Sequence, residues 1–132
     1  METRISKVSL LWVIIMVGFA MHMLADMLPA FWGANIAMPD ATGEAPTGML
    51  LFMIGMAFSV PMCGLLCMNY RSCKTMRVIN LVLATLMMLF NLFHATELFA
   101  EFNLVQLLIH PVMAALGIYL FIYSLRLLKQ KD

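Results

Sequence analysis

The sequence predicts an all-α integral membrane protein, a four-helix bundle with up-down-up-down topology. Three observations predict this class: the composition, the length of the apolar stretches and the placement of the basic residues. Of 132 residues, 64% are hydrophobic and 11% are charged. A soluble domain carries about 25% charged residues, and so short a chain cannot bury this excess of apolar side chains. The lipid bilayer is therefore the expected partner, and the net charge of +1 predicts no nucleic-acid partner.

Four apolar stretches are each long enough for a helix that crosses about 30 Å of hydrocarbon. We place these spans at about residues 8–28, 47–68, 76–98 and 106–125, within a single domain of residues 1–132. Strands of a membrane barrel would alternate polar and apolar residues, whereas Val78–Phe90 is apolar on nearly every side. Each stretch is therefore predicted to be a helix, because a helix satisfies its own backbone in the absence of water.

The first two spans carry local features of their own. The first follows basic residues, as a signal peptide does, but its apolar run continues to Leu28 without a clean cleavage site, so we expect it to be retained. An irregular segment, Pro29–Pro46, follows it and is rich in Pro, Gly, Ala and Thr. In the second span Pro61 predicts a kink, because proline lacks the backbone N–H.

Small residues at close to helical spacing predict where the second and fourth spans approach their neighbours. They are Gly55, Ser59 and Cys63 on the second span, and Ala114, Gly117 and Ser124 on the fourth. The connections after the second and third spans are short, so consecutive helices are expected to be antiparallel neighbours.

The basic residues predict the orientation of the bundle. All eight lie before the first span, between the second and third, or after the fourth: Arg4, Lys7, Arg71, Lys74, Arg77, Arg126, Lys129 and Lys131. By the positive-inside bias, both termini are cytoplasmic and Leu28–Pro46 and Phe99–Asn103 face outward, in a multi-pass protein of the bacterial inner membrane. Trp12 and Trp32 lie near predicted span ends, where interfacial aromatics are common.

Polar residues within the apolar spans form the candidate site. An ionisable side chain inside a span costs about 2.5–3.5 kcal/mol on insertion scales, so each is a functional candidate. The candidates for ligand binding or proton relay come from three spans: His22, Asp26, Asn91, His94, Glu97 and His110. Glu101 follows the third span, and Gln106 lies four residues before His110. At 100° per residue one stripe of the third span holds Asn80, Met87, Asn91, His94 and Glu101, with Glu97 at its margin.

The three histidines are expected at one depth, within roughly 5–10 Å of the outer boundary. If they converge, His22, His94 and His110 suit zinc, iron or copper, since neutral imidazoles bind these ions. Two of them on facing helices would also serve as axial ligands of a haem. A third possibility is a proton relay of alternating imidazoles and carboxylates, with no metal.

The methionines and cysteines leave two further readings open. Fifteen methionines are present, and Met21, Met23 and Met27 flank the polar residues of the first span. Thioethers together with imidazoles suit Cu(I), while methionine also lines apolar pockets that adapt to varied ligands. Cys63 and Cys67 lie four apart toward the cytoplasmic end of the second span, and Cys73 follows in the loop. We interpret the cysteines as packing residues, with a soft-metal relay or palmitoylation as the alternatives.

Four short segments stand out: Lys7–Trp12 at the start of the first span, Ala25-Asp26 near its end, Val60–Met62 in the second, and Arg77–Asn80 at the start of the third. In these segments the chain resembles a family of small four-span bacterial inner-membrane proteins of unknown function. The resemblance implies the same fold and membrane, and it implies no activity. Enzymatic activity is not the favoured interpretation, because none of the serines lies near the histidines to act as a nucleophile.

Two functional hypotheses follow. In the first, the polar residues form a ligand, metal or proton site, within a homo-oligomer if the protein transports. In the second, the protein is an accessory or structural membrane subunit and its polar side chains only tie helices together. Geometry distinguishes the two, because a shared site needs imidazoles within about 4–5 Å of one another around a common point.

Overall fold

A computed structural model describes residues 2–37, 43–44, 46–70, 73–100 and 104–130, and the regular structure within them is entirely helical. The elements, in chain order, are α1 (Glu2–Met27), η1 (Leu28–Trp32), α2 (Thr47–Ile54), η2 (Gly55–Ser59), α3 (Val60–Tyr70), α4 (Lys74–Ala95), α5 (Glu97–Ala100) and α6 (Gln106–Leu128). The all-α prediction is therefore confirmed for the described part of the chain.

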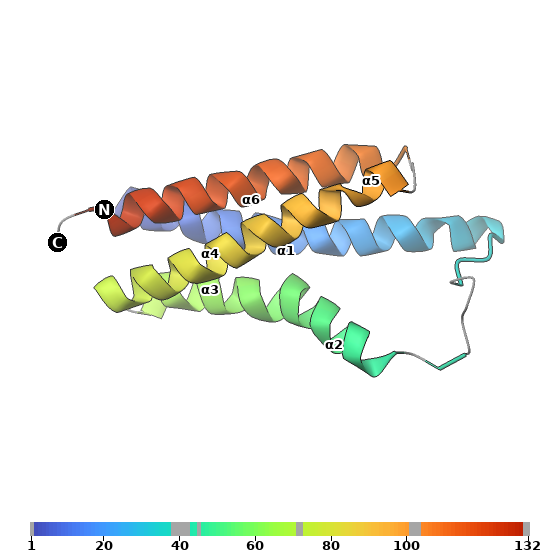
Figure 1. Ribbon diagram of the computed structural model, residues 1–132, viewed down its shortest axis with the longest axis horizontal. Helices are drawn as coiled ribbons and strands as arrows, with labels where there is room; N and C mark the ends of the chain where they lie inside the picture. Colours follow the sequence, from blue (N-terminus) through green and yellow to red (C-terminus); the bar gives the residue numbers. More distant parts are fainter. Residues whose placement is uncertain (1, 38–42, 45, 71–72, 101–103, 131–132) are drawn as a thin grey trace.

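Within the described part of the chain, four apolar helical segments are long enough to cross a membrane, and they lie close to the predicted spans. They cover Lys7–Trp32, Thr47–Tyr70, Lys74–Phe99 and Gln106–Leu128. They pack in a ring, in which α1 contacts α3 and α6, and α4 contacts the same two helices from the other side. Both chain ends lie at one end of the bundle, called here the basic end (Figure 1).

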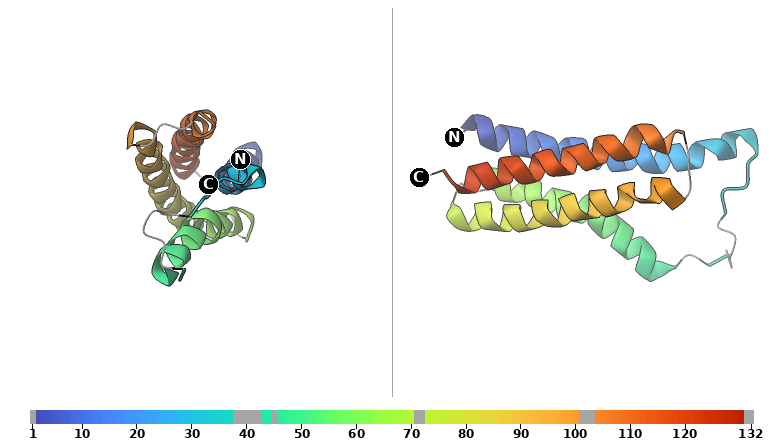
Figure 2. Two further views of the ribbon diagram at one scale, coloured as in Figure 1. Left: turned by 90° about the vertical axis from the view of Figure 1, so that its right-hand side faces the viewer. Right: turned by 45° about the horizontal axis from the view of Figure 1, so that its top comes forward.

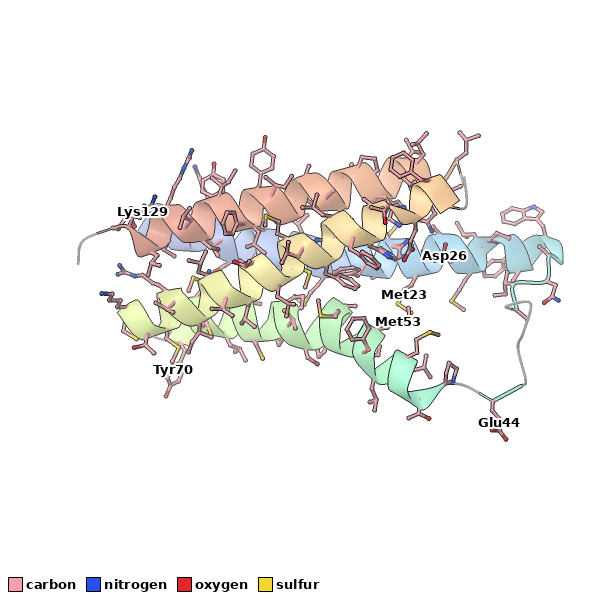
Figure 3. The ribbon with its side chains drawn as sticks, in the orientation of Figure 1. Met23, Asp26, Glu44, Met53, Tyr70 and Lys129 are labelled. Atoms are coloured by element: carbon pink, nitrogen blue, oxygen red, sulfur yellow. The ribbon has the colours of Figure 1, made fainter. Side chains whose placement is uncertain are left out.

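The basic residues that the structure describes gather at the basic end. Lys7 and Arg126 each lie 5.8 Å from the ring centre of Tyr123, and Arg77 donates to the backbone carbonyl of Gln130. Figure 3 places Lys129 at this end and Glu44 at the opposite one. Arg71 and Lys131 lie outside the described residues. The described basic residues, which cluster at three places in the sequence, thus lie together at one end of the bundle.

The second span is interrupted before Pro61, as predicted, and the interruption takes the form of a wide turn. Residues Gly55–Ser59 adopt a π-helical turn between α2 and α3. Such a turn carries one extra residue and redirects the chain, and a proline just beyond it supplies no N–H for the regular ladder. Consequently α2 leans away from the bundle (Figure 2) and contains no buried residue.

The small residues predicted to mark helix contacts on the second span do not do so. A Cβ on Gly55 would meet nothing within 4 Å, and Ser59 and Cys63 are exposed. The close approach occurs instead at Gly64, where a Cβ would lie 2.2 Å from the indole ring of Trp12. The π turn rotates the faces of α2 and α3 relative to each other, so the helical spacing used for the prediction does not hold across it.

The corresponding prediction for the fourth span is confirmed. A Cβ on Gly117 would lie 3.1 Å from the Cα of Met88, so glycine lets α6 approach the backbone of α4. Ser124, two turns further along, is also buried. These positions explain the extensive contact between α4 and α6.

Trp12 is not an interfacial residue, and that interpretation was wrong. Its side chain is completely buried and its indole N–H donates to Oδ1 of Asn80 over 2.8 Å. Asn80 in turn donates to Oγ of Ser124, also over 2.8 Å. Tryptophan is common at the headgroups because its N–H finds a hydrogen-bond partner there, and the N–H of Trp12 already has a partner inside the bundle. Trp32, at 81% exposed, remains free to lie there.

Candidate functional site

Three histidines from three different helices meet inside the bundle. His22 comes from α1, His94 from α4 and His110 from α6, and one ring nitrogen of each lies within 4.8 Å of the others. The ring centroids are 4.7 Å, 4.8 Å and 5.0 Å apart. This separation meets the 4–5 Å criterion for a shared site, and we call the three residues the histidine cluster.

Two side chains orient the ring of His22. Its Nδ1 lies 2.7 Å from Oε1 of Gln106, and the amide nitrogen of Gln106 donates to Oδ1 of Asp26. Because a carboxylate only accepts, Asp26 turns the amide so that its carbonyl oxygen faces His22. A carbonyl oxygen also only accepts, so Nδ1 of His22 carries a hydrogen, and in the neutral ring Nε2 carries a lone pair.

Glu97 orients His94 in the same way. Its Oε1 lies 2.9 Å from Nδ1 of His94, three residues earlier in the chain. The carboxylate accepts from Nδ1, which leaves the lone pair of this ring also on Nε2. A carboxylate that holds the outer nitrogen of a histidine is the arrangement found behind metal-binding histidines in proteins.

The two lone pairs point at each other. Nε2 of His22 and Nε2 of His94 are 2.9 Å apart. Two neutral imidazoles in these tautomers have no hydrogen to share between these atoms, so the contact is repulsive unless a proton or a metal cation lies between them. The hydrogen bonds behind the rings thus create a position that attracts a cation.

His110 is the most deeply buried member of the cluster. Its side chain is 4% exposed, and neither ring nitrogen has a hydrogen-bond partner within the described part of the chain. Burying a polar group without a partner costs about 1–3 kcal/mol. Since the ring faces His22 and His94, a cation bound between them would remove this cost.

The remaining predicted residues occupy different positions around the cluster. The side chain of Asp26 is 51% exposed, and its Oδ2 lies 3.6 Å from Nε2 of His22, too far for a hydrogen bond. Asn91 is 1% exposed and packs against Gly117, and no hydrogen bond joins its amide to the cluster or to another described residue. Glu101 lies outside the described residues.

A pocket of about 250 Å³ adjoins the cluster on the side where α2 leans away. His22, His94 and Glu97 form its polar end, and the rest of its wall is apolar: Phe19, Met23, Met49, Phe52, Met53, Ala57, Phe90 and Phe93. Figure 3 shows Met23 of α1 and Met53 of α2 on opposite walls. Of the three methionines that flank the polar residues in the sequence, Met23 alone lines this pocket.

Sequence reasoning missed two parts of the site. Gln106 was noted for its spacing from His110, yet it was not placed among the site residues, although it joins Asp26 to His22. The four-residue spacing, which sets both side chains on one face of α6, was the available signal. The pocket was missed because it depends on the π turn, for which the sequence shows no clear pattern.

The three cysteines are free thiols.

Comparisons of this chain with protein-family models, with curated proteins and with solved structures found no match. The resemblance to small four-span bacterial membrane proteins therefore stays a prediction. The function has to be argued from the geometry of the histidine cluster and of the pocket beside it.

Proposed function

We propose that this protein is a multi-pass protein of the bacterial inner membrane that binds a transition-metal ion through His22, His94 and His110. The observation that carries the proposal is the facing pair of Nε2 atoms, 2.9 Å apart, beside a buried imidazole with no hydrogen-bond partner among the described residues. With both termini in the cytoplasm, as the basic residues favour, the site lies in the outer half of the membrane.

The distances favour a small ion over a haem. Two nitrogens bound to one tetrahedral zinc lie about 3.3 Å apart, since each bond is near 2.0–2.1 Å. The Nε2 atoms of His22 and His94, 2.9 Å apart, lie close to this value, and the ring nitrogens of all three histidines lie within 4.8 Å of one another. A porphyrin between two axial histidines would hold their ring centroids about 6 Å apart, which is wider than the observed 4.7–5.0 Å.

The charges near the cluster support a divalent cation. Asp26 and Glu97 place two carboxylates next to the three imidazoles: Glu97 bonds Nδ1 of His94, and Asp26 bonds Gln106 and lies 3.6 Å from Nε2 of His22. Nitrogen ligands of this kind suit Zn²⁺ and Cu²⁺, and three of them leave a fourth position for another donor.

An accessory subunit without a ligand is the alternative function. The hydrogen bonds of Gln106 tie α1 to α6 in either case, so they support both functions. His110 separates the two hypotheses. Its imidazole bonds no other residue that the structure describes, so it contributes no hydrogen bond that ties helices, and it does offer a metal ligand.

Elemental mass spectrometry of the protein purified in mild detergent tests the proposal. We expect one zinc or copper ion per chain after loading, and loss of that ion in His110→Leu, which keeps the volume and removes the nitrogens. Met113→Leu is the matched control, because Met113 is equally buried on the same face of α6. Equal metal content in the two variants, or none in the parent protein, would support the accessory role instead.

A further inference from the structure

The pocket beside the histidine cluster has an aromatic body. Phe90 lies at its centre: its ring is 5.8 Å from that of Phe19 and 5.9 Å from that of Phe52, and it stacks on His94 at 5.7 Å with an interplanar angle of 10°. Phe93 completes the set of aromatic walls. Stacked and edge-on phenyl rings favour a flat aromatic guest.

Methionines form the rest of the apolar wall and make it adaptable. Met23, Met49 and Met53 line the pocket from α1 and α2, and their unbranched side chains repack easily around a guest and contact aromatic rings favourably. A pocket of this composition, with one polar end, is typical of sites for small apolar molecules that carry a single polar group.

The polar end of the pocket coincides with the metal position. His22 and His94 line the pocket, while His110 lies behind them and does not. Three histidine ligands leave one position of a tetrahedral ion open. With His110 behind the ion, the open position faces the pocket, where an oxygen lone pair of a guest would complete the coordination.

The guest would enter from the lipid. Met49, Phe52 and Met53 line the pocket and are all exposed, by 50%, 58% and 39%, on the helix that leans away from the bundle. No charged side chain other than Glu97 lies among the lining residues that the structure describes. An aqueous metabolite with several charges would find no partners in such a wall.

We propose that the pocket binds a lipid-soluble aromatic molecule with one oxygen donor, such as a phenol, whose oxygen coordinates the metal ion. This inference rests on the proposed function, since the oxygen needs the ion as its partner. The ring would lie among the phenylalanines, and the oxygen would take the position that faces away from His110.

The test uses the full chain in detergent, loaded with Co²⁺, whose visible absorption reports its coordination. Cobalt stoichiometry is measured first, and 1-naphthol is then titrated. We expect 1-naphthol to shift the cobalt bands with saturation, and naphthalene, which lacks the oxygen, to leave the bands unchanged while competing with 1-naphthol.

Two variants in which an alanine is replaced by phenylalanine locate the binding site. Ala57 lines the pocket and Ala115 is exposed on α6. In Ala57→Phe the new ring fills the pocket, so 1-naphthol should bind about tenfold more weakly or worse, while cobalt stays at one ion per chain. The variant Ala115→Phe should bind cobalt and 1-naphthol like the parent protein.

The outcomes separate this inference from the proposed function. Cobalt bound at one ion per chain with bands that 1-naphthol does not shift would overturn the inference alone. An equal response in Ala57→Phe and Ala115→Phe would also overturn it, by placing the naphthol elsewhere. Failure to bind cobalt would overturn the proposed function and this inference together.

Discussion

Trp12 donates its indole N–H to Asn80 across 2.8 Å inside the bundle, although 68 residues separate them in the sequence. Asn80 is completely buried and also bonds Ser124, so one amide joins α1, α4 and α6. An amide with partners on two other helices specifies how all three are rotated. The same rotation brings the three histidines together further along these helices.

Removal of this amide should destabilise the bundle. Asn80→Ala leaves Trp12 and Ser124 buried without a partner, and we expect a loss of about 1–3 kcal/mol in the free energy of unfolding. Thermal unfolding in detergent, followed by circular dichroism, measures the change. Asn69→Ala is the control, because the amide of Asn69 is exposed and its bonds are to Ser9 and to its own helix. Equal midpoints in the two variants would contradict the prediction.

Two glycines of the second span should respond oppositely to alanine. Gly64→Ala puts a Cβ against the rigid indole of Trp12, so α1 and α3 must move apart at a cost of about 1–3 kcal/mol. Gly55→Ala meets open space and should leave stability unchanged or slightly raised. Unfolding midpoints of the two variants check this, and a destabilised Gly55→Ala with a neutral Gly64→Ala would show that the helix contact is placed wrongly.

Gln106 should affect metal affinity without contacting the metal. Gln106→Ala breaks the link from Asp26 to His22, so the ring of His22 loses its orientation and we expect about 10–100-fold weaker zinc binding. Competition against a chromophoric chelator gives the dissociation constant. Thr85→Ala, which removes a hydroxyl bonded within its own helix, should bind zinc like the parent. Unchanged affinity in Gln106→Ala would exclude the orienting role.

Glu97 should act through its acceptor oxygen. Glu97→Ala removes the acceptor from Nδ1 of His94 and should weaken zinc binding about tenfold, near the lower limit for such groups because this carboxylate is 54% exposed. Glu97→Gln keeps a carbonyl acceptor and should recover most of the affinity. The same chelator competition measures both, and an equal loss in both would assign the effect to charge alone.

Cysteine labelling tests the orientation in the membrane. Glu44 and Lys129 lie at opposite ends of the bundle (Figure 3) and both are exposed. In a chain with its native cysteines replaced by alanine, a membrane-impermeant maleimide added to intact spheroplasts should label Glu44→Cys and leave Lys129→Cys unlabelled until lysis. The reverse pattern would place the histidine cluster in the cytoplasmic half.

The sequence predicts the helices and part of the site well, because both depend on local properties. Apolar length is a property of each segment, and the 100° period placed Asn80, Asn91 and His94 on one face of α4, which the structure turns inward. The predicted interfacial position of Trp12 was wrong because its hydrogen-bond partner, Asn80, lies on another helix. A single sequence does not show which residues of different helices are in contact. The π turn was missed because backbone hydrogen bonds, rather than side-chain pattern, decide it.

The buried faces of α4 and α6 show what lies between the two polar regions of the bundle. From Asn91 to Asn80 the buried residues of α4 are Met87 and Ala84, and from His110 to Ser124 those of α6 are Met113, Gly117 and Leu120. Eleven residues of helix span about 16 Å, and this belt offers no hydrogen-bonded route from either helix. This apolar belt separates the histidine cluster from the basic end. A ligand of the cluster should therefore enter and leave without passing the basic end, and we expect no ion current through the bundle.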